Sequence, residues 1–294
     1  MRPTIVRSIC IASLALPTAL PAAAHDFWIE PATFRPAPGE TVAVSLRVGD
    51  GPPGDALPRE ERRIVRFELL GPDGAAQVAG AEGRAPAGVV RPGGPGAYAV
   101  VYRSTDSAVE LAAGAFESYL AQEGLERIVG LRAERGESGE PGREQFSRSV
   151  KALLVAGPGS PSRPWAPASS SARFHAVHLR PTALPLELVP AASPYDPEAP
   201  LERLPFTLLF ENEPLAGALV EAFRREAPSA VQRARTDRRG RAVFNVAAGG
   251  SWLVTAVHME PEPPGSGSDW RSVWTSLTFE VAGRADPVAE GAGP

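Results

Sequence analysis

Short stretches in which apolar and polar residues alternate recur along most of the chain. In residues 41–48, for example, Val42, Val44, Leu46 and Val48 alternate with more polar or smaller residues. This period of two is typical of a strand with one buried face. Further strands are predicted at 64–70, 97–102, 146–155, 186–189, 206–210, 218–223, 242–246, 252–258 and 273–281. Connections rich in glycine and proline separate them, a spacing typical of a β-sandwich.

One segment has a different period. Between Leu111 and Arg135, apolar residues such as Phe116, Leu120 and Ile128 recur at steps of three to five among charged residues. This pattern predicts one amphipathic helix, interrupted at Gly124.

Residues 157–171, which are rich in proline and serine, have no periodicity and mark a boundary. We therefore predict a mainly β protein with two antiparallel β-sandwich domains, at 25–156 with the helix inserted and at 172–283. Residues 284–294 are expected to be a disordered tail.

The first 24 residues have the features of a secretory signal peptide. Arg2 and Arg7 precede an apolar run from Ile9 to Leu20, and three alanines at 22–24 provide a cleavage site. The apolar run is shorter than a membrane-spanning helix needs and contains a proline. We expect a mature protein in the periplasm that does not span the membrane and, because Cys10 is the only cysteine, has no thiol.

Composition narrows the class of protein further. The 294 residues include 32 prolines and 29 glycines, many of which lie in the predicted turns and in the predicted linker. The net charge is −4 and would fall to −6 once the two arginines of the signal peptide are removed. With no basic stripe evident, a nucleic-acid-binding function is not expected.

Cleavage after Ala24 would make His25 the first residue of the mature chain. Its α-amine and its imidazole could then bind one metal ion, and this chelate suits Cu(II) or Ni(II). Without thiols, any metal site must use nitrogen and oxygen ligands. A cleavage site that merely happens to adjoin a histidine is the competing interpretation.

The sequence gives weaker evidence of a functional role for the other three histidines. His258 ends a predicted strand, where it shares a face with Trp252, Val254 and Ala256, and either a structural or a functional role fits. His175 and His178 are expected to be a solvated pair. None of the common catalytic motifs is found, so we do not expect an enzyme.

The opening sequence Ala24-His25-Asp26-Phe27-Trp28-Ile29-Glu30-Pro31 resembles an exported family that contains a domain of unknown function and is labelled the periplasmic component of a cobalt or nickel transport system. Further similar motifs follow in the same order almost to the end of the chain, namely Phe116 to Leu120, Phe146 to Arg148, Leu186 to Pro190, Pro214 to Gly217, Thr236-Asp237, Val257 to Met259, and Asp269-Trp270.

The resemblance implies β-sandwich architecture, a periplasmic location and the handling of nickel or cobalt ions. It also implies that the second domain is prealbumin-like, related to the immunoglobulin-like sandwiches. By position, His25 and His258 match histidines of the family and become candidate metal ligands, with Asp26 as an oxygen ligand.

The leading hypothesis is a non-enzymatic periplasmic protein that binds a divalent transition metal (Ni, Co or Cu) and passes it to a membrane transporter. The alternative is a cell-surface or adhesion-type scaffold that binds protein or polysaccharide without metal. A third hypothesis, a copper-dependent polysaccharide monooxygenase, rests only on the N-terminal histidine, and the residues after it do not resemble those enzymes.

Overall fold

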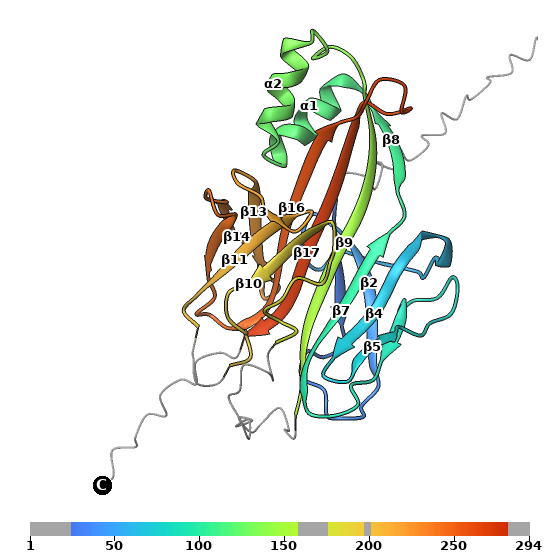
Figure 1. The fold of residues 1–294 in the computed structure, drawn as a ribbon, viewed down its shortest axis with the longest axis vertical. Coiled ribbons are helices and arrows are strands. Elements are labelled where there is room, and N and C mark those ends of the chain that lie inside the picture. The colour runs from blue at the N-terminus through green and yellow to red at the C-terminus, as the bar shows by residue number, and fades with distance from the viewer. Residues whose placement is uncertain (1–24, 158–175, 197–200, 282–294) are drawn as a thin grey trace, which may run out of the picture.

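A computed structural model describes residues 25–157, 176–196 and 201–281. The predicted signal peptide (1–24), nearly all of the predicted linker (157–171), His175 and the predicted tail (284–294) lie outside the described residues. The prediction of a mainly β protein is confirmed. The strands form one large sheet with a smaller sheet on each face, a sandwich-type arrangement (Figure 1).

Nine strands make up the central sheet, in which β8 pairs with β9 beside the order β14-β13-β16-β17-β9-β7-β4-β5. Their bounds are β4 Ile64–Gly71, β5 Gly74–Gln77, β7 Gly96–Ser104, β8 Ser107–Leu111, β9 Gly142–Ala156, β13 Leu219–Arg224, β14 Ala227–Arg235, β16 Gly250–Pro261 and β17 Trp270–Val281. The strands predicted for two separate sandwiches thus share one sheet. β9 and β17 join the two halves as a parallel pair, with Ser149 beside Thr275, whereas the neighbouring pairs are antiparallel.

The first small sheet covers one face of the central sheet. It contains β1 Asp26–Pro31, β2 Val42–Gly49, β3 Asp55–Leu57 and β6 Gly88–Val90. The hydroxyl of Ser276 donates to the carbonyl of Phe27 at 2.8 Å, and that of Thr278 donates to Ile29 at 2.7 Å. These bonds satisfy carbonyl groups of β1 and fix this strand across β17.

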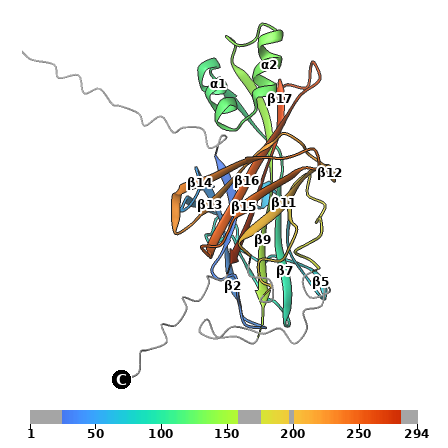
Figure 2. The same cartoon turned by 90° about the vertical axis from the view of Figure 1, so that its left-hand side faces the viewer.

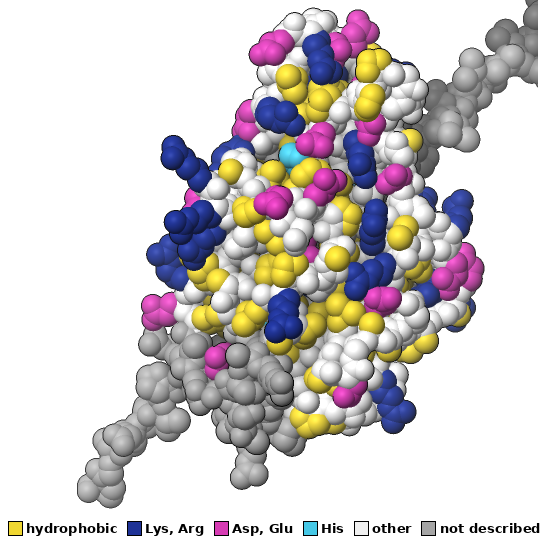
Figure 3. Space-filling model, in the orientation of Figure 1, with side chains coloured by type: hydrophobic (Ala, Val, Ile, Leu, Met, Phe, Trp, Pro, Cys, Tyr) yellow, Lys and Arg dark blue, Asp and Glu magenta, His cyan; other side chains and the backbone are white. Residues whose placement is uncertain are grey.

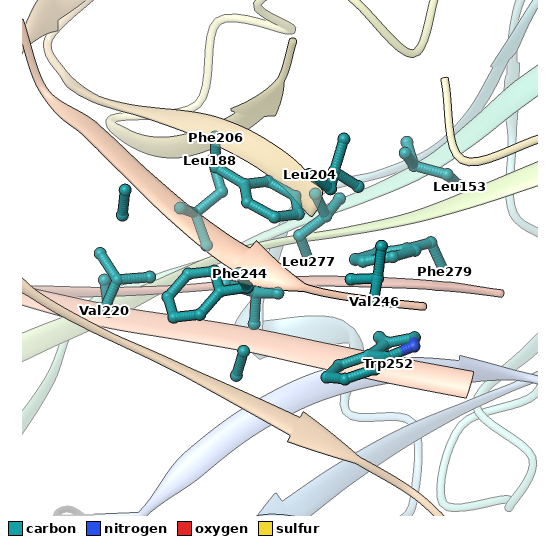
Figure 4. Close-up of a cluster of buried hydrophobic side chains, with 14 of the residues drawn as sticks. Leu153, Leu188, Leu204, Phe206, Val220, Phe244, Val246, Trp252, Leu277 and Phe279 are labelled. Atoms are coloured by element: carbon teal, nitrogen blue, oxygen red, sulfur yellow. The ribbon is translucent and has the colours of Figure 1, made fainter. Parts of the chain in front are cut away.

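The second small sheet covers the opposite face. It contains β10 Leu186–Pro190, β11 Arg203–Phe210, β12 Glu213–Pro214 and β15 Arg241–Asn245. Phe206 and Phe244 of this sheet pack against Leu277, Phe279 and other apolar residues of the central strands (Figure 4). The central sheet is therefore buried on both faces, which explains why β16 and β17 are almost continuously buried.

Two short helices, α1 Ala113–Gln122 and α2 Glu126–Glu134, replace the single predicted helix. They cover the end of the central sheet on the same face as β1, where Phe116, Leu120 and Ile128 pack against Val257 and Trp274 (Figures 1 and 2). The predicted interruption at Gly124 is confirmed, and its φ of +66° is a left-handed conformation that favours glycine. None of the described helices is long and apolar enough to cross a membrane.

Candidate functional site

His25 and Asp26 lie where β1 begins, beside the loop that follows β2. Asp26 pairs with Gly49 across the two strands. Gly51 and Gly54 of the loop have positive φ angles of +83° and +53°, and a Cβ atom on Gly54 would lie only 2.2 Å from the ring of Trp28. Glycine at this position therefore lets the loop pack tightly against β1.

This packing brings two candidate ligands together. Nδ1 of His25 lies 2.6 Å from Oδ1 of Asp50 in the loop. The imidazole is partly buried, whereas the Asp50 side chain is 83% exposed. Sequence analysis missed Asp50, because nothing in the local pattern indicates which residue of a Gly-Asp-Gly-Pro-Pro-Gly turn will meet a histidine 25 positions earlier.

Asp26 points toward the central sheet. Its carboxyl group accepts hydrogen bonds from the Thr255 hydroxyl on β16 and the Gly51 amide. Burial, together with the negative charges of Glu221 and Asp50, raises the pKa of this carboxyl to about 7, although the two hydrogen bonds act in the opposite direction. The Asp26 carboxyl group therefore changes between its neutral and its ionised form near neutral pH.

Glu123 and Glu221 complete an acidic cluster around β1, which we define as Asp26, Asp50, Glu123 and Glu221. Burial raises the pKa of Glu123, at the end of α1, to about 9, with further contributions from the charges of the other three carboxylates. Glu221 on β13 is directly opposite Thr255 in the register and forms an ion pair of 2.5 Å with Arg233.

Cationic groups near the cluster do not remove this repulsion. The buried guanidinium of Arg148 lies 4.6 Å above the ring of Phe27 and interacts electrostatically with Asp26. Even so, the pKa values of Asp26 and Glu123 remain far above their ordinary range. Additional positive charge at this place would therefore stabilise the ionised carboxylates.

His258 does not lie with His25 and Asp26. Side chains alternate along β16, so Thr255 and Val257 face β1 and the helices, whereas Ala256 and His258 face the opposite small sheet. The His258 ring packs 4.4 Å from the ring of Phe210, and its Nε2 is 3.5 Å from a Glu260 oxygen. Burial lowers its pKa. The predicted association of His258 with the His25 ligand set is wrong, because the sheet separates them.

His178 is also placed differently from the sequence-based expectation of a solvated pair. It is fully buried, with Nε2 positioned to donate to the carbonyls of Leu154 and Tyr98 at 2.9 and 3.1 Å. Its Nδ1 is 3.0 Å from the hydroxyl of Ser193. These contacts tie the segment after the predicted linker to β7 and β9, which is a structural role.

Within residues 25–157, 176–196 and 201–281, no three His, Asp or Glu side chains are arranged to hold a metal ion by themselves. His25 contacts Asp50, and the charges of Asp50 and Glu221 act on Asp26. A metal ion here would need a further ligand or a small rearrangement of these side chains. The α-amine of His25, if cleavage occurs as predicted, would supply that ligand.

The fold and this cluster define a mainly β sandwich-type protein with an acidic cluster at the start of its first strand. A family model matches residues 22–260, and the chain therefore belongs to the family with a domain of unknown function called DUF4198. No match is found among curated proteins.

Proposed function

We propose that the chain is an exported protein that binds a divalent transition metal, Ni, Co or Cu, through His25 and passes it to a membrane uptake system. The observation that carries the proposal is the contact of 2.6 Å between the His25 imidazole and the Asp50 carboxylate, beside the half-buried Asp26. Imidazole nitrogen with carboxylate oxygen is a donor set for these metals.

The ligand set that we propose is the α-amine and imidazole of His25 with an oxygen of Asp50, and with Asp26 next to them. His258 is omitted, because it faces the other side of the central sheet. The amine would exist only after cleavage behind Ala24, so metal binding is expected of the processed chain and not of the precursor.

Electrostatics supports a cation at this place. Beside burial, which is the largest cause, the charges of Glu221 and Asp50 raise the pKa of Asp26, and the charges of Asp26, Glu221 and Asp50 raise the pKa of Glu123. A divalent cation held by His25 and Asp50 would relieve this repulsion. Glu123 and Glu221 need not touch the metal for this effect, because their charges act over several ångströms.

We infer the kind of metal and the uptake role from the resemblance of the opening motif to the family labelled as a cobalt or nickel transport component. The comparison with DUF4198 names neither of them. The uptake role is therefore proposed on that label and on the predicted export of the chain.

The test is calorimetric titration of Ni(II), Co(II) and Cu(II) into two forms of the protein. One form begins at His25 and the other carries one additional residue, Ala24, which removes the free amine from His25. We expect at least a tenfold loss of affinity in the longer form and in His25→Ala, and no change in His258→Ala.

Equal affinities of the two forms would eliminate the chelate. Absence of saturable binding of any of the three metals to the form that begins at His25 would refute the metal-binding function. The alternative predicted from the sequence, a scaffold that binds protein or polysaccharide, would then take its place.

A further inference from the structure

A cavity of about 570 Å³ lies between the end of β4 and residues 176–183, a segment that contacts β4 and β7. We call it the β4 cavity. It lies on the face of the molecule that Figure 3 shows, where basic side chains stand among hydrophobic ones over β4, β7 and β9. Three residues that line it, Arg180, Pro181 and Ala183, are exposed, so a dissolved molecule can reach it. Its volume is in the range of small-molecule sites.

The lining of the β4 cavity combines apolar groups with two cations. Leu70, Pro72 and Val177 are among its apolar residues. Arg66 and Arg180 also line it, whereas no aspartate or glutamate of the described residues does. A mainly apolar lining with a few charged groups is typical of a site that binds and orients a small ligand. The sign of the two charges indicates that the polar end of this ligand is an anion.

Arg66 on β4 is held in one orientation but is not saturated with hydrogen bonds. Its Nε donates to Glu68 at 2.7 Å, and its Nη1 donates to the Thr182 carbonyl at 2.5 Å. The side chain is 26% exposed, and its Nη2 donates to no acceptor among the described residues. Because two of its nitrogens are already fixed, the guanidinium group loses little freedom when it binds an oxyanion.

Arg180 adds a positive charge that no nearby carboxylate compensates. The charge of Arg66 is balanced by Glu68, to which it is paired. Arg180, in contrast, is exposed and forms no ion pair within the parts of the chain that the structure describes. Since both arginines line the same cavity, an anion bound there would be attracted by two guanidinium groups.

The segment that carries Arg180 is fixed on both sides of this residue. On one side, the buried ring of His178 lies within hydrogen-bonding distance of carbonyl oxygens of β7 and β9. On the other, the amide and the hydroxyl of Thr182 donate to the buried Glu187 carboxylate at 2.8 and 2.9 Å. The wall of the cavity is therefore formed in advance, which lowers the entropic cost of binding.

We propose that the β4 cavity binds a small amphipathic anion, a molecule with an oxyanion head, carboxylate or phosphate, and a short apolar chain. Arg66 and Arg180 would bind the head, and the apolar residues of the lining would cover the chain. Leu70 packs on the core beneath the second small sheet, whereas β1 with His25 covers the opposite face of the central sheet. The proposal therefore does not depend on the proposed metal binding.

The experiment is calorimetric titration of hexanoate, hexyl phosphate, acetate and 1-hexanol into the full mature chain. We expect saturable binding of hexanoate, of hexyl phosphate or of both, and the tighter of the two identifies the head group. Acetate lacks the apolar chain and 1-hexanol lacks the charge, so each should bind at least tenfold more weakly than the tighter anion.

Variants then assign the binding to the cavity. Arg180→Gln changes an exposed side chain and should weaken binding of the anion about threefold to tenfold, and Arg66→Gln should weaken it tenfold or more. Arg66→Lys keeps the charge beside Glu68 but not the fork, so it should have intermediate affinity and guards against misfolding of the glutamine variant. Arg241→Gln, which removes an exposed arginine outside the cavity, is the matched control and should bind as the unaltered chain does.

Absence of saturable binding of both hexanoate and hexyl phosphate to the unaltered chain would overturn the proposal. So would equal affinity for acetate or for 1-hexanol, because the cavity would then not recognise both ends of the ligand. An affinity that is unchanged in both Arg180→Gln and Arg66→Lys would place the binding elsewhere and contradict it. A loss in Arg241→Gln as large as in Arg180→Gln would show general attraction of anions to the surface and would overturn it as well.

Discussion

Replacing Asp26 with asparagine provides a direct test of the electrostatics of the acidic cluster. Asparagine has nearly the same shape as aspartate, and its carbonyl oxygen can still accept the hydrogen bonds from Thr255 and Gly51. The substitution therefore removes the charge and keeps the packing. In metal-free buffer, we expect Asp26→Asn to be more stable than the unaltered protein at pH 7.5 and equally stable below pH 4.

The size of this effect follows from the pKa of Asp26, which is about 7 in the folded protein and 3.8 in its ordinary state. Because the folded state holds the proton more tightly, the free energy of unfolding falls as the pH rises from about 4 to about 7 and is level above that range. The difference between these two pKa values corresponds to about 4 kcal/mol. Since Asp26 is partly exposed, we expect solvent screening to reduce the difference to about 2 kcal/mol.

Urea unfolding at pH 4, 5.5 and 7.5, with a chelator present, measures this difference. Glu123 and Glu144 also have raised pKa values and contribute to the pH dependence of both proteins. The charge of Asp26 is one cause of the raised pKa of Glu123, so the difference curve reports on Asp26 together with its effect on Glu123. Asp50→Asn, whose side chain is 83% exposed, is the control and should shift stability by less than about 0.5 kcal/mol. If Asp26→Asn were less stable than the unaltered protein at pH 7.5, the carboxylate would have to be compensated in the folded state and the reasoning would fail.

Three further substitutions test other parts of the structure by chemical or thermal unfolding. Lys151→Met leaves the buried Glu187 carboxylate without its cation and should lower the free energy of unfolding by about 3–5 kcal/mol. The double variant that also carries Glu187→Leu should recover part of this stability. Gly124→Ala should lower the free energy of unfolding by about 1–3 kcal/mol, because the residue has a φ of +66° and its new Cβ would lie 2.7 Å from Leu219. Gly130→Ala, which places a methyl group in open space on α2, is the control and should be neutral or slightly stabilising. His258→Ala should destabilise the fold by about 1–3 kcal/mol through lost packing on Phe210, with no change in metal affinity by calorimetry.

The local elements could be predicted from the sequence because they depend on nearby residues. Alternation correctly placed most of the longer strands, and Gly124 marked the break between α1 and α2. The pairing of β9 with β17 was not predictable in this way, because it joins residues more than 120 positions apart and no local period encodes which strands become neighbours. The single shared sheet is therefore the largest departure from the two predicted sandwiches.

The candidate site was predictable only in part, for a related reason. Alternation correctly put His258 on one face with Trp252, Val254 and Ala256. The sequence does not say which face β1 covers, and β1 lies on the other one, so the two histidines were grouped wrongly. Glu123 has no local signal as a site residue, because its role depends on where α1 ends relative to β1.

The shared sheet has a consequence for how the acidic cluster forms. Asp26, Asp50 and Glu123 belong to the first half of the chain, whereas Glu221 and Thr255 belong to the second. The Thr255 hydroxyl reaches Asp26 only because β16 and β17 join the strands of the first half through β9. Since the hydrogen bond and the repulsion from Glu221 both cross this junction, the unusual pKa of Asp26 reports on the assembly of the whole sheet. Because Thr255 and Glu221 come from the second half of the chain, the pKa of Asp26, and any binding property that depends on this carboxyl group, depends on both halves.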